Sequence, residues 1–139
     1  ESLVDRFTFE IIGDAKNVQS ECNIEIEGNV SGGCKAGKNI NVSGVVSGGC
    51  NSGAETVIGG HLSGGCNSGG DITVAGSFSG GCNTGGGITC GGNFSGDINC
   101  GGEVTVKGNV EAVKIKGNVV CNSLKCDKVE GDVTINKVD

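Results

Sequence analysis

Apolar and polar residues alternate along the chain in short segments that recur at a fixed interval. In Ile72-Thr73-Val74 two apolar side chains flank a polar one, so the two apolar side chains lie on one face of an extended segment. Three residues are too few to form the apolar stripe of a helix. Gly, Asn and Ser separate each segment from the next, which is typical of turns. The pattern therefore predicts short β-strands joined by tight turns.

The interval between equivalent segments is 16 residues. The string SGGC starts at Ser31, Ser47, Ser63 and Ser79, and apolar positions before and after it keep the same spacing. A unit that turns three corners and then repeats in register predicts one coil of a parallel β-solenoid, with coils about 4.8 Å apart. We therefore expect an all-β protein, a single-chain parallel β-helix of roughly seven to eight coils. The pattern leaves the handedness of the helix open.

Two columns of equivalent positions are predicted to form the centre of the core. Glycine and other small residues occupy most inward positions, which leaves room for about one large side chain per coil. Small side chains form one column, and longer side chains form the other. The predicted core ladder consists of Cys34, Cys50, Cys66 and Cys82 in the first column and of Val46, Leu62, Phe78 and Phe94 in the second.

The register weakens at both ends of the chain, as is common in terminal repeats. Residues 1–12 lack glycine and are expected to form an N-terminal cap or an opening strand. Residues 13–139 are expected to form the solenoid, with regular coils over about 18–112 and irregular coils over 113–139. In the irregular part, Val113 reaches the cysteine column one residue early, which predicts a shortened coil.

Composition narrows the class of protein further. The chain has 29 Gly, no Pro and 35% apolar residues, so a core of large side chains is disfavoured, while 19% charged residues are too few for a disordered chain. No apolar run approaches the length that a membrane span requires. The net charge of −6 argues against nucleic acid as a partner.

The residues that carry chemistry in other proteins are sparse or badly spaced here. One histidine without a neighbouring acid gives no acid–base site, so we expect no enzyme and no cofactor. The nine cysteines lie mostly 16 residues apart, unlike zinc ligands, and in-register strands would strain a disulfide. Cysteine is therefore interpreted as a small buried apolar residue, with disulfides and metal as less favoured alternatives. Free thiols favour the cytoplasm, which is a reducing compartment. If a leader preceded Glu1 and was removed, the expected location is extracellular instead.

Three strings resemble a known family. GNVSGGCKAGKNINVSG, GGDITVAGSFSGG and GGEVTVKGNV are similar to the coils of the bactofilins, bacterial cytoskeletal proteins that form polymers. The resemblance extends over roughly residues 13–135. It implies a right-handed β-helix and assembly end to end into filaments without a nucleotide.

The open ends of a solenoid give an independent reason to expect self-association. Each end exposes an unpaired strand edge and an apolar cross-section. The apolar residues expected at the two ends are Phe7, Phe9 and Ile11 at one and Val133 and Ile135 at the other. The alternative is a non-enzymatic rod, fibre-like or binding, that presents ladders of Asn, Ser and Thr to a partner, a glycan or an ice surface.

Overall fold

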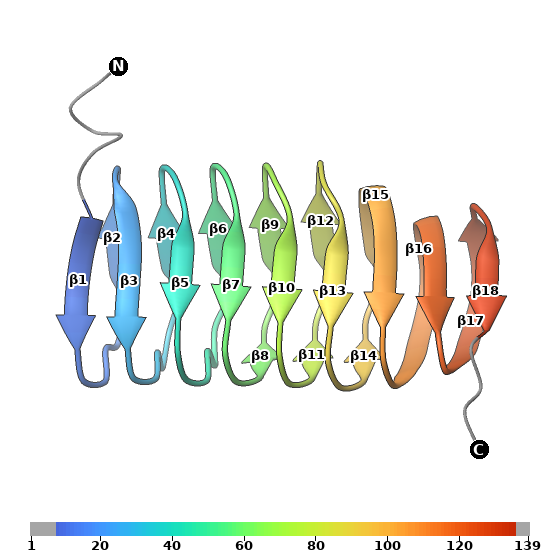
Figure 1. The fold of residues 1–139 in the computed structure, drawn as a ribbon, viewed down its shortest axis with the longest axis horizontal. Coiled ribbons are helices and arrows are strands. Elements are labelled where there is room, and N and C mark those ends of the chain that lie inside the picture. Colours follow the sequence, from blue (N-terminus) through green and yellow to red (C-terminus); the bar gives the residue numbers. More distant parts are fainter. Residues whose placement is uncertain (1–7, 136–139) are drawn as a thin grey trace.

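The computed structural model describes residues 8–135, and this part of the chain is a parallel β-solenoid of about eight turns (Figure 1). Its 18 strands form one continuous sheet. In Figure 1 the near strands run down and the far strands run up while the chain advances from left to right, so the coil is right-handed. The described range holds no helix of the length and apolarity that a membrane crossing requires.

Each coil has three faces, which we name after their inward residues. The cysteine face contains β2 (Val18–Ser20), β4 (Cys34–Ala36), β6 (Cys50–Ser52), β9 (Cys66–Ser68) and β12 (Cys82–Thr84). The isoleucine face contains β1 (Thr8–Ile12), β3 (Asn23–Glu27), β5 (Ile40–Val42), β7 (Thr56–Ile58), β10 (Ile72–Val74), β13 (Ile88–Cys90) and β18 (Val133–Ile135). The phenylalanine face contains β8 (Leu62–Ser63), β11 (Phe78–Ser79) and β14 (Phe94–Ser95). The long strands β15 (Ile98–Val106), β16 (Asn109–Cys121) and β17 (Ser123–Glu130) continue round the corners between faces.

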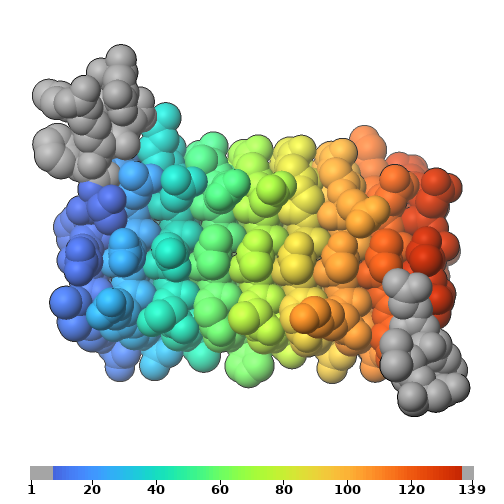
Figure 2. Space-filling model, viewed as in Figure 1, coloured from blue at the N-terminus to red at the C-terminus, as the bar shows by residue number. Residues whose placement is uncertain are grey.

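The strands stack in the register that the repeat interval predicts. Cys50 lies opposite Cys66, and Phe78 lies opposite Phe94. All pairs between strands are parallel, and on the isoleucine face the outward side chains line up in rows along the rod (Figure 2). The predicted fold class is therefore confirmed.

The core is continuous along the rod and consists of the buried columns of the three faces. The rings of Phe78 and Phe94 stack with their centroids 4.5 Å apart and their planes at 21°. Coils approach so closely at the corners that a Cβ on Gly53 would collide with the carbonyl oxygen of Gly37 in the preceding coil. Every residue of the predicted core ladder is buried, namely Cys34, Cys50, Cys66, Cys82, Val46, Leu62, Phe78 and Phe94.

The two ends depart from the regular interval in different ways. Residues 8–12 form the opening strand β1, which pairs with β3 so that Thr8 lies opposite Asn23, a step one residue shorter than the regular one. Near the C-terminus Ile98 lies opposite Ile115, so this coil is one residue longer than the regular coils. The next coil is shorter than the regular ones, because Ile115 lies opposite Val129.

The prediction that Val113 enters the cysteine column one residue early is wrong. Ile115 takes that place and is fully buried, whereas Val113 is 62% exposed. The reason lies in the preceding coil, where the Asp97 carboxylate accepts hydrogen bonds from the backbone N–H groups of Val113 (2.9 Å) and Lys114 (3.1 Å). These two bonds hold the extra residue in the corner.

Polar side chains at the corners connect successive coils. Asn39 Oδ1 accepts the N–H of Glu55 at 2.9 Å, and Asn29 Oδ1 accepts the N–H of Val45 at 2.8 Å. The Nδ1 atom of His61 accepts the N–H of Ser77 at 2.8 Å. The histidine therefore has a structural role that its isolated place in the sequence does not suggest.

Candidate assembly surfaces at the two ends of the solenoid

The N-terminal end presents one edge of β1 and several apolar side chains. β1 pairs with β3 on its inner side, and no other coil of the described range lies on its outer side. Phe9 is 48% exposed although it stands in a column whose next member, Ile24, is buried, and Ile11 is half-buried. Phe7, the third residue expected at this end, lies outside the described residues.

The C-terminal end presents a similar surface on the last coil. β18 pairs with β16, and Val133 and Ile135 on it are 41% and 47% exposed. Leu124 and Val129 of β17 are half-buried and pack against the end of the core. Four residues expected at the ends, Phe9, Ile11, Val133 and Ile135, are therefore at least partly accessible.

The exposed residues at the two ends occupy the same columns. The pairings lead without interruption from Phe9 through Ile24 and its successors to Val119 and Val133. In the second column of this face, the same strands connect Ile11 with Val106, and Cys121 with Ile135.

The other two faces behave alike. Val18 and Val129 begin and end the column of the cysteine face. Ala15 and Leu124 begin and end the column of the phenylalanine face. The isoleucine face has one level more than either of the other two, so its strand, β1 or β18, lies outermost at both ends.

Backbone groups at the two ends point away from the body of the rod. Inside the solenoid, Val119 N–H donates to the carbonyl of Asp132 in the following coil at 2.8 Å, and Ile24 N–H donates to Asn39 in the same way at 2.9 Å. In the same column, the N–H of Val133 points to the place where a further coil would lie. Its counterparts at the other end are the carbonyl of Thr8 and the N–H of Ile12.

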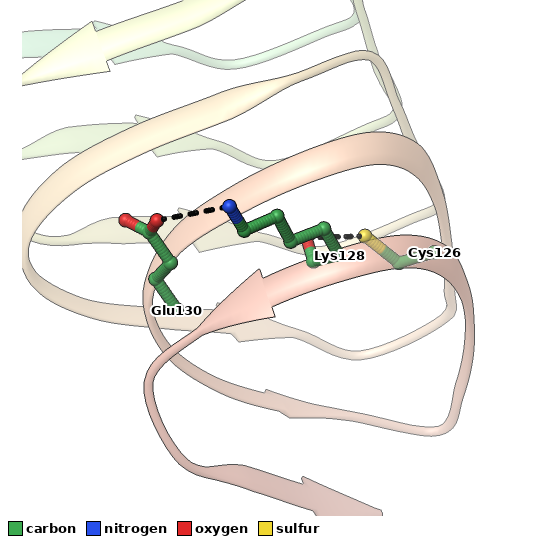
Figure 3. A network of polar contacts seen from close by, with 3 residues as sticks. All are labelled: Cys126, Lys128 and Glu130. Atoms are coloured by element: carbon green, nitrogen blue, oxygen red, sulfur yellow. Dashed lines mark hydrogen bonds and ion pairs between the residues drawn. The ribbon is translucent and has the colours of Figure 1, made fainter.

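The charged side chains of the last coil lie on its outer wall. Lys128 Nζ and Glu130 Oε1 form an ion pair at 3.5 Å on the outward side of β17 (Figure 3). Val129, between them in the sequence, packs against the core. The pair is 65% and 45% exposed, so its contribution to stability is small. In the same figure the Cys126 thiol donates to the Lys128 carbonyl at 3.1 Å.

The Asn ladder of the cysteine face differs from the ends in being polar. Asn51, Asn67, Asn83 and Asn99 form an exposed ladder on the cysteine face, and Asn67 Nδ2 donates to Asn51 Oδ1 at 3.2 Å. A shallow depression runs along this ladder and is bordered by Asp97 and Lys114 at one end.

The cysteines are free thiols, and most of them are buried, seven of the nine in all. Burial raises the pKa of the Cys34 thiol to about 11 and that of the Cys66 thiol to about 12, so both stay protonated at neutral pH. Among residues 8–135, no three or more His, Cys, Asp or Glu side chains are grouped so that they could hold a metal ion.

Comparison of the chain with protein-family models, curated proteins and solved structures gave no match.

Proposed function

We propose that this protein is a structural scaffold that assembles end to end into filaments without a nucleotide. One observation supports the proposal above all others: the columns of the isoleucine face end in exposed or half-buried apolar residues at both ends of the rod, and they are the same columns. In this proposal the protein is not an enzyme, its partner is another copy of itself, and it works in the cytoplasm. The resemblance to the bactofilins agrees with such a role.

Burial of the apolar side chains at the ends favours association in this proposal. Complete burial of a Phe, Ile or Val side chain contributes roughly 1.5–3 kcal/mol. Phe9, Val133 and Ile135 are each about half exposed, and Ile11, Leu124 and Val129 add further partly exposed surface. Together with backbone pairing across the junction, this burial opposes an association cost of roughly 4–15 kcal/mol. At half exposure these side chains offset only part of the cost, so assembly at micromolar concentration requires that the backbone edges pair as well.

Sedimentation velocity of the purified protein and three variants tests the proposal. The unaltered protein should form long species without nucleotide, and electron microscopy should reveal unbranched filaments. Phe9→Lys and Ile135→Lys place a charge on an exposed end residue, so the rod should stay folded and sediment as smaller species. Asn67→Lys is the matched control, because it adds the same charge to the exposed lateral ladder and should leave assembly intact.

Two results would contradict the proposal. Dissociation of the Asn67 variant, with both end variants still assembled, would mean that copies associate laterally. A stable monomer of the unaltered protein at all concentrations would favour the alternative, a rod whose Asn ladder and neighbouring depression bind another molecule.

A further inference from the structure

We propose that the cysteine face carries a groove for a neutral polysaccharide, which lies along the rod and contacts successive coils with its hydroxyl groups. The groove runs beside the Asn ladder from Asn17 to Asp97. Its floor is a column of glycines, namely Gly33, Gly49, Gly65 and Gly81. This binding does not depend on assembly, because the groove lies on the side of the rod and not at its ends.

The fold itself does not require glycine in the floor of the groove. None of the floor glycines has the positive φ that favours this residue. A Cβ on Gly33, Gly65 or Gly81 would have its nearest neighbour at 3.6, 3.4 and 4.0 Å respectively, so a side chain fits. At Gly64, by contrast, a Cβ would lie 2.5 Å from the carbonyl oxygen of Gly48. Packing between coils therefore explains Gly64 but not the open floor beside it.

The residues that close the column at its two ends show which chemistry the groove offers. Asn17 stands in the place of a floor glycine, and its Oδ1 atom accepts the N–H of Gly33 at 3.1 Å. At the other end the Asp97 carboxylate accepts the N–H groups of Val113 and Lys114. At both ends a side-chain oxygen thus binds backbone N–H groups of the following coil.

Between these ends the corresponding donors lack an acceptor. The N–H groups of Gly49, Gly65 and Gly81 bond to no other residue among 8–135. In each case the equivalent residue of the preceding coil is itself glycine and has no side-chain oxygen. These groups form a row with one donor per coil, spaced by about 4.8 Å. Backbone N–H groups are strong donors, so the row favours a ligand that carries oxygen atoms at this spacing.

The Asn ladder supplies both donors and acceptors along one side of the groove. Asn51, Asn67 and Asn83 are exposed and lie opposite one another on neighbouring strands. Each amide has one acceptor oxygen and two donor hydrogens. A hydroxyl group is uncharged, accepts a hydrogen bond from an N–H and donates one to an amide oxygen. A chain rich in hydroxyl groups therefore complements both the floor and the ladder.

Charge and spacing disfavour other extended polymers. Residues 72–96 contain no Asp, Glu, Lys, Arg or His, and charged side chains border the groove only towards its ends, near Lys35 and near Asp97. An anionic chain finds no cation in the middle of the groove and is repelled by the net charge of −6. Equivalent groups of an extended peptide recur about every 6.8 Å and lose step with the coils. Hexose units in a straight β-linked chain recur at nearly the spacing of the coils.

Isothermal titration calorimetry with cellohexaose, a straight oligosaccharide of β-linked glucose, tests the proposal. The unaltered protein should bind it. In Gly65→Asn the new side chain should accept the N–H of Gly81, as Asn17 accepts that of Gly33, so the affinity should fall about tenfold. Thr73→Asn is the matched control, because it adds the same side chain to the outward side of β10 on the isoleucine face and should leave the affinity unchanged.

Three results would overturn the proposal. Failure of the unaltered protein to bind cellohexaose rules out the ligand, although filaments that still form would leave the scaffold function standing. Unchanged affinity in a folded Gly65→Asn variant means that the sugar binds elsewhere. Binding of polyglutamate in preference to cellohexaose means that the groove accepts an acidic peptide instead.

Amide hydrogen exchange in the unaltered protein provides a second test that needs no variant. Cellohexaose should slow the exchange of the N–H groups of Gly49, Gly65 and Gly81 about tenfold, since each gains an acceptor. The N–H of Gly33 is the internal control, because Asn17 already accepts it, and its exchange should not change. Unchanged exchange at all of these glycines in the presence of bound sugar would contradict a site in the groove.

Discussion

The cysteine residues act as packing groups because their thiols are small, apolar and buried between coils. Burial raises the pKa of all four thiols in the column from Cys34 to Cys82 above the ordinary value of 9.0, and at Cys50 and Cys82 the neighbouring thiols raise it further. A thiol that ionises only far above pH 9 is a poor nucleophile and a poor metal ligand at neutral pH. The column therefore contributes packing rather than chemistry.

These raised pKa values predict that the protein loses stability in alkali. Above pH 9 the thiols of the unfolded chain release protons while the buried thiols of the folded chain keep theirs. The free energy of unfolding should thus be fully retained below about pH 8 and should fall as the pH rises from 9 towards the folded pKa, by up to about 1.4 kcal/mol per pH unit for each thiol. Urea unfolding at several pH values measures this slope. Cys66→Ala should have a smaller slope than the unaltered protein, and equal slopes would mean that the thiol does not stay protonated.

Thr56 is a buried polar residue in a column that otherwise consists mainly of isoleucines. It lies between Ile40 and Ile72, is fully buried, and its hydroxyl makes no hydrogen bond of good geometry within residues 8–135. The hydroxyl does lower the pKa of the Cys66 thiol, against the larger effect of burial, but a thiol is a weak hydrogen-bonding partner. Leaving a buried polar group unsatisfied costs about 1–3 kcal/mol. The column therefore contains a local defect.

Thr56→Val should remove this defect and raise the free energy of unfolding by about 1 kcal/mol, since the shape is kept and the unpaired hydroxyl is lost. Thermal or urea unfolding measures the gain. Thr73→Val is the control, because Thr73 points outward on the next coil and its replacement should change stability by less than about 0.5 kcal/mol. A loss of stability on replacing Thr56 would show that its hydroxyl is satisfied in solution.

At the scale of the element, each coil is attached to the next by strand pairing and by polar side chains at the corners. Asn29, His61 and Asn93 occupy one corner column and each accepts a backbone N–H from the residue 16 positions later. Val45 stands in the same column and has no side-chain acceptor. Its coil is therefore attached less firmly at this corner.

Val45→Asn should supply the missing acceptor for the N–H of His61 and raise the melting temperature, corresponding to about 1 kcal/mol for one additional hydrogen bond. Differential scanning calorimetry measures the change. Val57→Asn is the matched control, because Val57 is similarly exposed but stands in the middle of β7 rather than at a corner, so this variant should gain nothing. An equal effect of both replacements would contradict the role assigned to the corner.

At the scale of the whole molecule, stability and assembly are linked in the proposed filament. Only the folded rod has ends that can dock, so association stabilises the folded state by mass action. The coils are joined almost entirely by contacts between neighbours in the stack, as in other repeat proteins. An end that gains a neighbour should therefore become as stable as the interior.

The melting temperature of the unaltered protein should accordingly rise with protein concentration, whereas that of the Ile135→Lys variant should not. Calorimetric scans over a hundredfold range of concentration make the comparison. Melting that is independent of concentration in both proteins would mean that association contributes nothing to the folded state.

The amino-acid sequence by itself determined the stack and its core. The regular interval of the repeat places Cys66 on Cys50 and Phe94 on Phe78. A slip of one residue would turn every inward side chain outward, so the alternation of apolar and polar residues permits only this register between coils. Other features were decided by the tertiary structure. Val113 and Ile115 fit the alternation equally well, and only the contact of Asp97 with the following coil selects Ile115 for the core.

The same reason applies to the corners and to the ends. Asn29 and His61 are read in the sequence as turn residues, because the backbone groups that they bind are 16 residues away and come into reach only when the coils stack. Likewise, Phe9 and Val133 are recognisable in the sequence as apolar residues near the two ends. That they stand in one column depends on coils of unequal length along the way, and these lengths are set by pairing between strands and not by any local pattern.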